Sequence, residues 1–237
     1  NPEHRAQIAI VGKYVELHDA YLSIREALVH AGVHHNAALD FRWVHSEDLE
    51  ARPAESVIGN VDGILLCPGF GDRGLEGKIN AVRHARENKI PYLGDCLGLQ
   101  MLVVEFARNV AGMEDANTTE ADPKTPFPVI SLLSEQQDVD DLGGTMRLGG
   151  YDCQLVAGTK AAECYGTDIV RERHRHRYEV SNQFLARLEE YGLRVSGRMS
   201  NSELVEIVEL TDHPWMVGCQ FHPEFTSRPN RANPLFL

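Results

Sequence analysis

The 237-residue sequence predicts an α/β fold in which a mostly parallel central sheet is flanked by helices, with additional antiparallel strands in the C-terminal half. Over the first 110 residues, short apolar runs alternate with segments of helical periodicity, which is typical of a doubly wound parallel sheet. The run 63–67 is uniformly apolar, as expected for a parallel strand buried on both faces. Beyond residue 150 strand-like runs dominate, and we interpret them as the antiparallel part of the sheet.

The first half of the chain is expected to supply the parallel strands and their connecting helices. Hydrophobic patterning predicts strands at residues 7–12, 39–43, 63–67 and 90–93. A first helix is expected after Asp19 and ends at Gly32. Its inward positions are Leu22, Ile24 and Leu28. A second helix is expected over residues 75–87, and a third runs from Cys96 to a stop at Gly112. The helically spaced apolar positions of the third are Leu99, Leu102, Val103, Phe106 and Val110.

The second half is richer in strands and in irregular segments. Residues 117–128 and 135–141 are expected to be loops because they concentrate Asp, Thr, Pro or acidic residues. Strand-like runs occupy residues 146–148, 153–156, 171–180, 193–196, 204–210 and 216–221. A helix over 183–191 is expected after Asn182 as its cap, and residues 227–234 are expected to form a surface tail. No internal repeat or linker is evident, so residues 1–237 are predicted to form a single domain.

Composition and charge exclude several classes of function. Hydrophobic residues make up 43% and charged residues 24%, and the net charge of −12 disfavours non-specific binding to nucleic acid or anionic membranes. No run approaches 18 apolar residues, and the N-terminal residues lack a signal-peptide core. The cysteines are odd in number, scattered and without a C-x-x-C pair, which argues against a disulfide framework or a Cys-rich zinc site. They are Cys67, Cys96, Cys153, Cys164 and Cys219. We therefore expect a cytoplasmic protein without a metal site.

One cysteine lies where a predicted strand turns into a predicted helix. Cys96 is flanked two residues away on either side by Gly94 and Gly98, which is the layout of a nucleophile elbow. Side chains at the two glycines are expected to collide with the neighbouring strand and helix. The unpaired N–H groups at the start of a helix favour a thiolate. The alternative is a buried structural cysteine that packs as a small apolar side chain.

A second motif follows the last predicted strand. Pro223 biases His222 toward an extended conformation, in which residues two apart point the same way, so His222 and Glu224 are expected to share a side. A carboxylate beside an imidazole fixes its tautomer and stabilises the imidazolium, leaving the other ring nitrogen to serve a nucleophile. Taken alone, this pair is better explained as a structural contact. With the cysteine elbow it completes a Cys-His-Glu triad in the chain order of hydrolase-like α/β sheets.

The run 171–177 alternates arginine with Glu or His. If it is extended, four arginines line one face, and Glu172, His174 and His176 line the other. Such a run suits either a solvated edge strand protected by charge or a surface that meets an anionic ligand or a partner domain. The two histidines have no third ligand at a spacing suited to a metal.

Several separated motifs resemble those of the class I, triad-type glutamine amidotransferases. The two principal ones are the elbow at residues 94–100 and the histidine motif at residues 221–224. Further stretches resemble the glutaminase domains of CTP synthases, and they lie at residues 11–14, 74–79, 143–149 and 173–179. The similarity covers essentially the whole chain.

The resemblance implies a chemistry and a role for each triad residue. Cys96 is the nucleophile that attacks the side-chain amide of L-glutamine, His222 is the general base and acid, and Glu224 orients it. Water then hydrolyses the glutamyl thioester. The ammonia goes to an ATP-dependent synthetase domain, expected outside this chain, which aminates UTP to CTP. No cofactor is implied here, since ATP and magnesium belong to that other domain, and the complete enzyme is expected to be a homo-oligomer.

The resemblance also assigns the residues that hold glutamine. Backbone N–H groups of Gly69, or its neighbour, and of Leu97 are expected to form the oxyanion hole. Gln100, Glu120 and Arg177 match the positions that hold the amino-acid end of the substrate. A carboxylate suits the α-ammonium group, and a guanidinium suits the α-carboxylate.

Two departures from the family pattern leave alternatives open. Asp95 replaces the aliphatic residue common in relatives, and its carboxylate either raises the pKa of the neighbouring thiol or points to the opposite side and bonds to backbone. Residues 67–71 read Cys-Pro-Gly-Phe-Gly, where many relatives have Pro-Gly-Gly-Phe-Gly, so the oxyanion donor is less firmly aligned. Two other functions therefore stay open: a non-catalytic binding or regulatory module, and a triad amidotransferase or γ-glutamyl hydrolase of another pathway.

Overall fold

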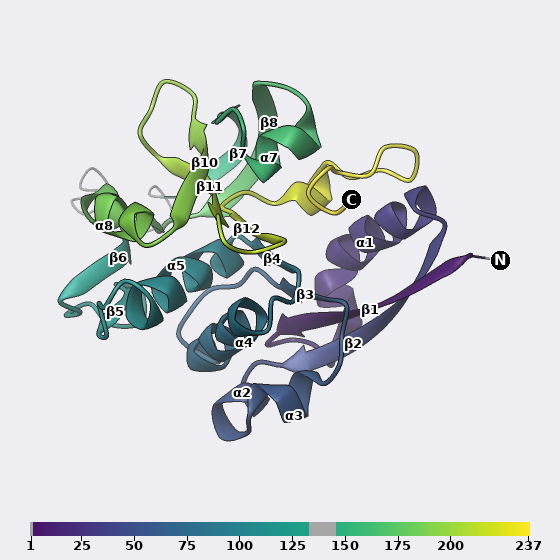
Figure 1. The fold of residues 1–237 in the computed structure, drawn as a ribbon, viewed down its shortest axis with the longest axis horizontal. Coiled ribbons are helices and arrows are strands. Elements are labelled where there is room, and N and C mark those ends of the chain that lie inside the picture. The colour runs from purple at the N-terminus through teal and green to yellow at the C-terminus, as the bar shows by residue number, and fades with distance from the viewer. Residues whose placement is uncertain (1, 133–145) are drawn as a thin grey trace.

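The computed structural model describes residues 2–132 and 146–237. Nine strands of this part of the chain form one sheet. They are β1 (His4–Gly12), β2 (Ala37–His45), β3 (Gly63–Leu66), β4 (Tyr92–Asp95), β7 (Arg147–Leu155), β8 (Ile169–His176), β10 (Leu193–Met199), β11 (Val205–Leu210) and β12 (Met216–Cys219). Their order across the sheet is β2-β1-β3-β4-β12-β11-β10-β7-β8 (Figure 1). The predicted α/β fold class is confirmed.

The sheet changes from parallel to antiparallel at β12. Strands β2, β1, β3, β4 and β12 are mutually parallel, and Gly218 of β12 pairs with Gly94 of β4. Strands β11, β10, β7 and β8 continue the sheet in antiparallel pairs. The carboxyl ends of β3, β4 and β12 therefore lie side by side, which is the edge where ligands bind in parallel α/β sheets.

Helices cover both faces of the sheet. They are α1 (Leu22–His34), α2 (Asp48–Ala51), α3 (Ala54–Ile58), α4 (Leu75–Glu87), α5 (Leu97–Asn109), α7 (Lys160–Tyr165) and α8 (Leu185–Glu190). Short 3-10 turns are η1 (His18–Tyr21), η3 (Asn182–Phe184) and η4 (Pro223–Phe225). One apolar core lies under α2, α3, α4, α5 and α8, and a second lies under α1 and α7. Alternate residues of β1 enter different cores, Ala9 and Val11 the first and Ile10 the second, as the period of a strand requires.

The first half of the chain follows the predicted order with local differences. Helix α1 continues past Gly32, and Leu22 is 46% exposed, so the expected stop and one inward position are wrong. The chain instead leaves the helix at Asn36, whose φ of 51° reverses its direction. Strand β4 begins two residues later than expected. Helices α2 and α3 were not predicted, because four- and five-residue helices carry little periodicity.

The second half differs more. The loop expected over 117–128 is present at residues 119–126, but strands lie at both of its ends. These strands are β5 (Ala116–Thr118) and β6 (Phe127–Ser131), and with β9 (Glu179–Val180) they form a small second sheet. Residues 147–155 form one strand rather than two. Ser181, not Asn182, precedes the helical turn, and it makes no side-chain cap. The loop predicted at 135–141 lies outside the described residues.

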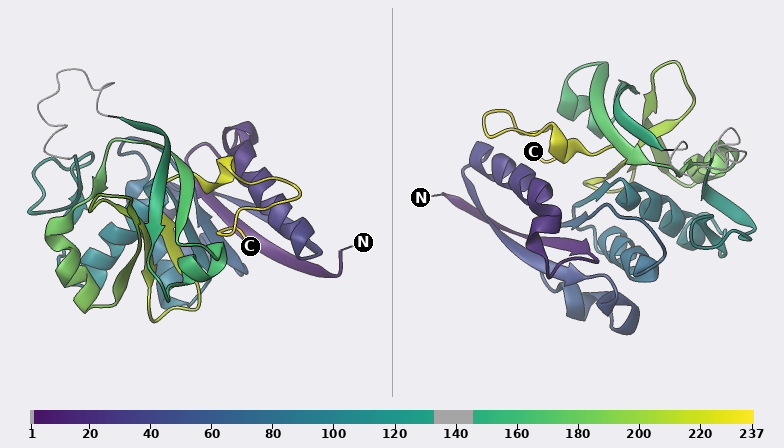
Figure 2. Two further views of the ribbon diagram at one scale, coloured as in Figure 1. Left: turned by 90° about the horizontal axis from the view of Figure 1, so that it is seen from above. Right: turned by 180° about the vertical axis from the view of Figure 1, so that it is seen from behind.

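The C-terminal segment is not a surface tail. Ser227 and Asn233 are each 3% exposed. Ser227 Oγ lies 3.0 Å from His30 Nδ1 on α1, and the Asn233 amide donates to Glu172 of β8 at 2.8 Å. The segment accordingly lies beside α1 in both views of Figure 2. Residues 228–231 are exposed, but these hydrogen bonds bury the two polar residues Ser227 and Asn233 on either side of them.

Candidate active site

The backbone at Cys96 is a sharp turn between β4 and α5. Cys96 has φ 52° and ψ −97°, a conformation that costs a side-chain-bearing residue strain and persists only where packing enforces it. A Cβ on Gly94 would lie 2.6 Å from the carbonyl carbon of Gly98. One on Gly98 would lie 2.7 Å from the carbonyl oxygen of Leu66. The collisions expected at the two glycines are confirmed.

The turn opens onto a cavity of about 270 Å³. Cys96, His222, Glu224 and Gly69 all line it. The other lining residues are Tyr14, Ala20, Tyr21, Ser23, Ile24, Pro68, Phe70, Arg175 and Phe225. Cys96 is 3% exposed, so its sulfur lies at the floor of the cavity rather than sealed in the core.

His222 and Glu224 meet as expected, by a different local route. The Nδ1 atom of His222 lies 3.0 Å from Oε1 of Glu224. His222 has φ −106° and ψ 87°, and Pro223 then begins the η4 turn that carries Glu224. The two residues are therefore not both extended. Pro at the first position of a helical turn sets the backbone that brings the carboxylate back to the ring.

The imidazole also interacts with the thiol of Cys96. Burial by itself lowers the pKa of His222, but hydrogen bonds with Cys96 and Glu224, together with Cys96 and Asp95 in their ionised forms, raise that pKa well above its ordinary value. The thiol contact is loose, since Nε2 has no partner with good hydrogen-bond geometry among the described residues. Such bonds in ligand-free sites often tighten only when substrate binds. The ring is thus suited to hold a proton beside a thiolate.

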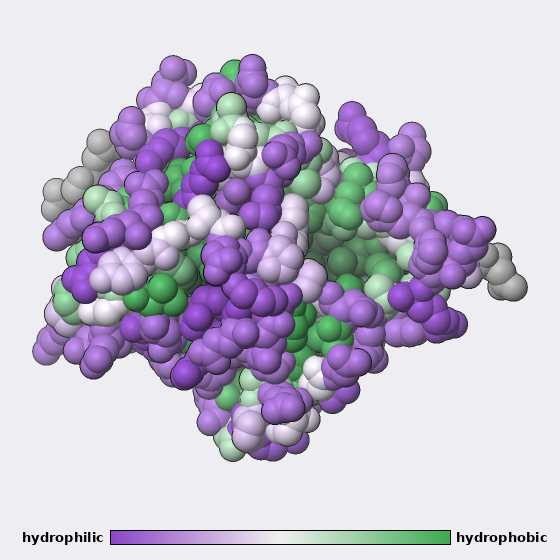
Figure 3. Space-filling model, viewed as in Figure 1, coloured by the Kyte–Doolittle hydropathy of each residue, from purple (hydrophilic) through white to green (hydrophobic). Residues whose placement is uncertain are grey.

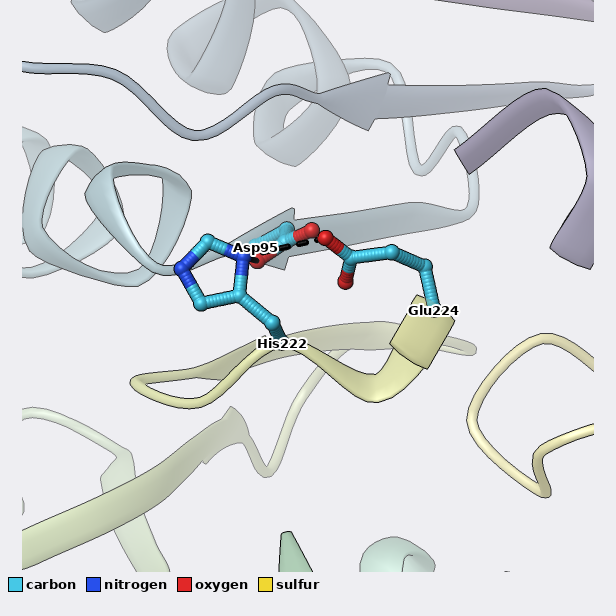
Figure 4. A group of neighbouring side chains, drawn as sticks. All are labelled: Asp95, His222 and Glu224. Atoms are coloured by element: carbon cyan, nitrogen blue, oxygen red, sulfur yellow. Dashed lines mark hydrogen bonds and ion pairs between the residues drawn. The ribbon is translucent and has the colours of Figure 1, made fainter. Parts of the chain in front are cut away.

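Asp95 does not point to the opposite side to bond to backbone, which was one of the two alternatives for it; its effect on the neighbouring thiol stays a prediction. Its side chain is fully buried and reaches His222, with Oδ1 at 3.4 Å from Nδ1. Figure 4 shows the Asp95 and Glu224 carboxyl groups pointing toward each other beside the ring. Asp95 bonds to no backbone group in the described chain. Burial and the Glu224 carboxylate raise the pKa of Asp95 well above its usual range.

The same three side chains are also close enough to hold a metal ion. The ligand atoms of Asp95, His222 and Glu224 lie within 4.8 Å of one another. An ion there would have to displace the hydrogen that Nδ1 shares with Glu224. That exchange would convert His222 from the partner of Cys96 into a ligand. The prediction that the chain has no metal site stays a prediction.

Two backbone N–H groups stand near the nucleophile. Leu97 begins α5, where the first N–H groups of a helix have no partner within the helix. A Cβ on Gly69 would lie 3.5 Å from Leu97 Cδ2, so the two residues are neighbours. Among the described residues, neither N–H has a hydrogen-bond acceptor. Both are available to an anionic oxygen.

The loop that contains Gly69 is held from two sides. Glu120 accepts a hydrogen bond from the backbone N–H of Gly71 at 2.7 Å. The Lys13 ammonium donates to the carbonyl oxygen of Phe70. Glu120, 49 residues away in sequence, is thereby fixed at the rim of the loop rather than left on the surface.

Gln100 and Arg177 occupy different positions relative to the cavity. Gln100 does not line it; its amide donates to the Tyr178 carbonyl at 3.1 Å and to Gln220 at 3.3 Å. Gln220 in turn lies 3.7 Å from the sulfur of Cys96. Arg177 lies in the turn after β8. Burial and Glu120 raise the pKa of Tyr178 while Arg177 lowers it, so both charged groups act at one hydroxyl.

The alternating run of arginines behaves as an edge strand. Strand β8 lies at the end of the sheet, with its arginines exposed and with Glu172, His174 and His176 buried. His174 Nδ1 is 2.9 Å from His176 Nε2. Burial and the nearby Arg147 lower the pKa of His174 to about 3, so the pair is neutral. The two histidines contact each other, the Glu206 side chain and the Tyr178 carbonyl, so their ring nitrogens take part in the packing of β8 against its neighbours.

Behind β8 lies a buried ionic cluster. Arg147 donates to Glu179 at 3.0 Å and to Glu206 at 2.7 Å, and His174 lies 3.3 Å from Glu206. Burial, partly offset by Arg147, raises the pKa of Glu179 to about 8 and that of Glu206 to about 7. The cluster ties β7, β9 and β11 together beside the site.

Lys78 is a charged neighbour of the site that the sequence reading missed. Its side chain is fully buried, and its ammonium has no hydrogen-bond partner among the described residues. Burial and Lys13 lower the pKa of Lys78 to about 8, against the opposing charges of Cys67, Cys96 and Glu120. A signal existed: Lys78 lies three residues after Leu75 and four before Val82, on the apolar face of the predicted helix.

A separate apolar cavity of about 430 Å³ lies away from Cys96 and forms the green hollow in Figure 3. It is bordered by β1, β3, β4 and the C-terminal residues Leu235, Phe236 and Leu237. Its titratable groups are Asp62, Tyr92 and Cys164. It therefore lacks the converging polar groups found around Cys96.

Among the described helices, none combines the length and the apolar character that spanning a membrane requires.

Comparison with known proteins gives a consistent result across the chain. The model of the family described as Glutamine amidotransferase class-I matches residues 16–237. The CTP synthase of Caldanaerobacter subterraneus subsp. tengcongensis is 58% identical over 236 residues, covering 100% of this chain and 44% of that protein. The CTP synthase of Carboxydothermus hydrogenoformans is 59% identical with the same coverage. The chain thus spans less than half the length of these relatives.

A solved structure is similar over nearly its full length. The glutaminase domain of Trypanosoma brucei CTPS with bound acivicin is 37% identical, and the match covers 98% of this chain and 91% of that one. Its TM-score is 0.90. A glutamine amidotransferase from Thermotoga maritima is 15% identical with a TM-score of 0.54, and it shares the fold over 94% of this chain and 77% of its own.

Proposed function

This chain belongs to the class-I glutamine amidotransferase family, and from that premise we propose that it hydrolyses the side-chain amide of L-glutamine to glutamate and ammonia. The observation that carries the proposal is one cavity lined by Cys96, His222 and Glu224, with the cysteine on a strained strand-to-helix turn. A buried structural cysteine would need neither that turn nor an imidazole partner. The pattern is that of an activated nucleophile, its base and the group that orients the base.

The first half of the reaction makes a thioester. The Cys96 sulfur adds to the amide carbon, and the carbonyl electron pair moves to oxygen. The N–H groups of Gly69 and Leu97, which have no acceptor in the described part of the chain, can stabilise the oxyanion. The C–N bond then breaks, and the leaving nitrogen takes the Nε2 proton of His222 to depart as ammonia.

The second half returns the enzyme to its starting state. Water adds to the thioester carbon and gives a proton to Nε2 of His222. The C–S bond breaks, glutamate leaves, and the thiolate reforms beside the imidazolium. Throughout, Glu224 accepts from Nδ1 and so keeps Nε2 directed toward the sulfur.

The amino-acid end of glutamine needs a carboxylate and a cation. We assign these to Glu120 and Arg177, which have opposite effects on the pKa of Tyr178 and therefore both lie near it. Gln100 takes a supporting role, since its amide holds the Tyr178 carbonyl and the Gln220 side chain. Specificity for glutamine over other amides would then come from groups that satisfy both charges of the substrate.

The ammonia is proposed to serve a synthetase domain that aminates UTP to CTP. The support is the 58% identity to CTP synthases, of which the chain spans 44%. We further propose that residues 1–237 form one glutaminase domain and that the complete protein is a homo-oligomer. Because relatives couple the two domains, glutaminase activity of the chain by itself should be weak.

Labelling by a glutamine-like electrophile tests the proposal directly. We expect acivicin to add once to the chain, on Cys96, as found by peptide mass spectrometry. The Cys96→Ala variant should take no label, and Cys164→Ala should be labelled like the parent, since Cys164 is an exposed thiol. Excess L-glutamine should protect Cys96. Label on Cys164 with none on Cys96 would contradict the proposal.

Turnover separates the proposal from the two rival functions. Glutamate and ammonia should appear from L-glutamine and increase when a CTP synthase synthetase domain, UTP and ATP are supplied. Binding of glutamine without turnover under those conditions would favour a non-catalytic module. Faster release of glutamate from γ-glutamyl peptides than from glutamine would favour a hydrolase of another pathway.

A further inference from the structure

Asp95 immediately precedes the nucleophile and has no part in the mechanism above. It is fully buried, and neither of its oxygens has a hydrogen-bond donor among the described residues. Its Oδ1 lies 3.4 Å from Nδ1 of His222. Glu224 contacts the same nitrogen at 3.0 Å, so two acidic groups lie beside Nδ1. Nδ1 carries one hydrogen, and the shorter contact assigns it to Glu224. Asp95 is therefore left without a donor.

Glu224 also has a carboxyl oxygen that lacks a hydrogen-bond partner. Its Oε2 is buried and without a partner in the described part of the chain. The two carboxyl groups point toward each other in Figure 4, and their oxygens belong to the group of atoms that lie within 4.8 Å of one another. Two ionised carboxylates at such a distance, out of water, repel strongly. One proton between them removes the repulsion and gives a hydrogen bond to atoms that otherwise lack one.

The surroundings offer no other source of compensation. The groups that act electrostatically on Asp95 are Glu224, His222 and Cys96, together with the Cys67 and Cys219 thiols and the Tyr92 hydroxyl. Glu172 of β8 faces Glu224. No lysine or arginine in the described ranges forms an ion pair with either carboxyl group. Lys78 acts on the Cys67 thiol, as Asp95 does, but it forms no ion pair with Asp95 or Glu224. Within the described ranges, the imidazolium of His222 is the one cation paired with these carboxyl groups, and it balances one negative charge.

We propose that Asp95 is a positioning residue that keeps its proton at neutral pH and donates it to Glu224, so that the pair carries one negative charge and presents a fixed acceptor to Nδ1 of His222. The inference rests on the proposed function in one respect, namely that His222 serves Cys96. The triad is thereby extended to four residues in a row: Asp95, Glu224, His222 and Cys96. The neutral acid fixes the Glu224 carboxylate without adding a second charge beside the thiolate.

Two variants distinguish a neutral Asp95 from an ionised one. Asp95→Asn keeps a donor and has no charge, whereas Asp95→Leu has neither donor nor charge and keeps the branching at Cγ in a larger side chain. Glutaminase kcat is expected to fall by less than about threefold in Asn and by about tenfold or more in Leu, because losing a hydrogen bond to a buried charge has effects of that size. If Asp95 only filled space, kcat would fall less in the Leu variant than in the Asn variant.

The pH profile of Cys96 alkylation by chloroacetamide adds a readout that needs no glutamine hydrolysis. If Asp95 is neutral, Asp95→Asn leaves the low-pH midpoint of the profile where it is in the parent. An ionised Asp95 disfavours the thiolate, so the same variant would move the midpoint down by about one pH unit or more. The midpoint is followed on the Cys96 peptide by mass spectrometry, so other thiols do not interfere.

Infrared difference spectroscopy reads the proton itself. The parent minus Asp95→Asn spectrum at pH 7 should contain the C=O stretching band of a protonated carboxylic acid. A missing band, or a lowered alkylation midpoint in Asp95→Asn, would overturn the inference. Neither measurement depends on turnover, so a chain that fails to hydrolyse glutamine still tests it. The Asn variant and the parent suffice if the Leu variant fails to fold.

Discussion

Replacing Lys78 with methionine is expected to stabilise the protein. The Lys78 ammonium is fully buried and has no hydrogen-bond partner among the described residues. Burial and the neighbouring Lys13 lower its pKa from 10.5 to about 8. Methionine has nearly the same length, fills the same space beside α4 and brings no charge into it.

The magnitude follows from the change in pKa on folding. Lowering the pKa from 10.5 to about 8 makes the folded state hold the proton less tightly than the unfolded chain, at a cost of about 3 kcal/mol in unfolding free energy at pH 7. Between pH 8 and 10.5 the unfolded chain binds more protons, so the stability of the parent rises with pH. At pH 9.5 the cost is about 1.4 kcal/mol.

The assay is urea unfolding of the parent and Lys78→Met at pH 7 and pH 9.5, followed by tryptophan fluorescence. The free energy of unfolding of the variant should exceed that of the parent by about 3 kcal/mol at pH 7 and by roughly half as much at pH 9.5. Lys124→Met is the matched control because Lys124 is exposed, and it should change stability by less than about 0.5 kcal/mol at either pH.

Two results would refute the reasoning. If Lys78→Met is less stable than the parent at pH 7, the ammonium makes a favourable interaction that outweighs its burial. If the difference in stability is the same at both pH values, Lys78 does not change its pKa on folding. In either case the positive charge near Cys96 would need a different explanation.

Three further predictions concern the elbow, the ionic cluster and the substrate. Gly98→Ala should lower the free energy of unfolding by about 1–3 kcal/mol and slow acivicin labelling, because the new Cβ would lie 2.7 Å from a backbone oxygen. A melting temperature equal to that of the parent would contradict this prediction. Arg147→Met should lower the free energy of unfolding by about 3 kcal/mol at pH 8. The loss should be smaller at pH 5, because Glu179 and Glu206 take up protons there. An equal loss at both pH values in urea unfolding would count against this. Glu120→Gln should raise KM for glutamine about tenfold, because the variant loses the charge that pairs with the α-ammonium group. The effect on kcat should be smaller, because the amide oxygen still accepts from the Gly71 N–H. An unchanged KM in steady-state kinetics would remove Glu120 from the substrate site.

Local signals were enough to predict the scaffold of the site. The apolar run at β3, the helix α4 and the glycine-flanked turn at Cys96 are each encoded within about a dozen consecutive residues. Strand and helix periodicities are local properties, so a single sequence reveals them. The exposed and buried faces of β8 were predicted for the same reason.

The errors arose where long-range contacts override local composition. The polar segment 227–234 is locally a tail, yet Asn233 is buried by its hydrogen bond to Glu172, 61 residues earlier. Glu120 was assigned to the glutamine site only through the family resemblance, because its partner Gly71 lies 49 residues away in the sequence. Neither partner is visible from the sequence near the residue concerned.

The sequence by itself determined which residues are candidates for the chemistry, because a thiol, an imidazole and a carboxylate are recognisable by type and by the turns predicted around them. Only the tertiary structure decided how the charges around them are arranged. It turned Asp95 toward Glu224 and His222, and it enclosed Lys78 without a hydrogen-bond partner among the described residues. The physical reason is that burial and pairing depend on every element packed against a group, and those elements come from distant parts of the chain.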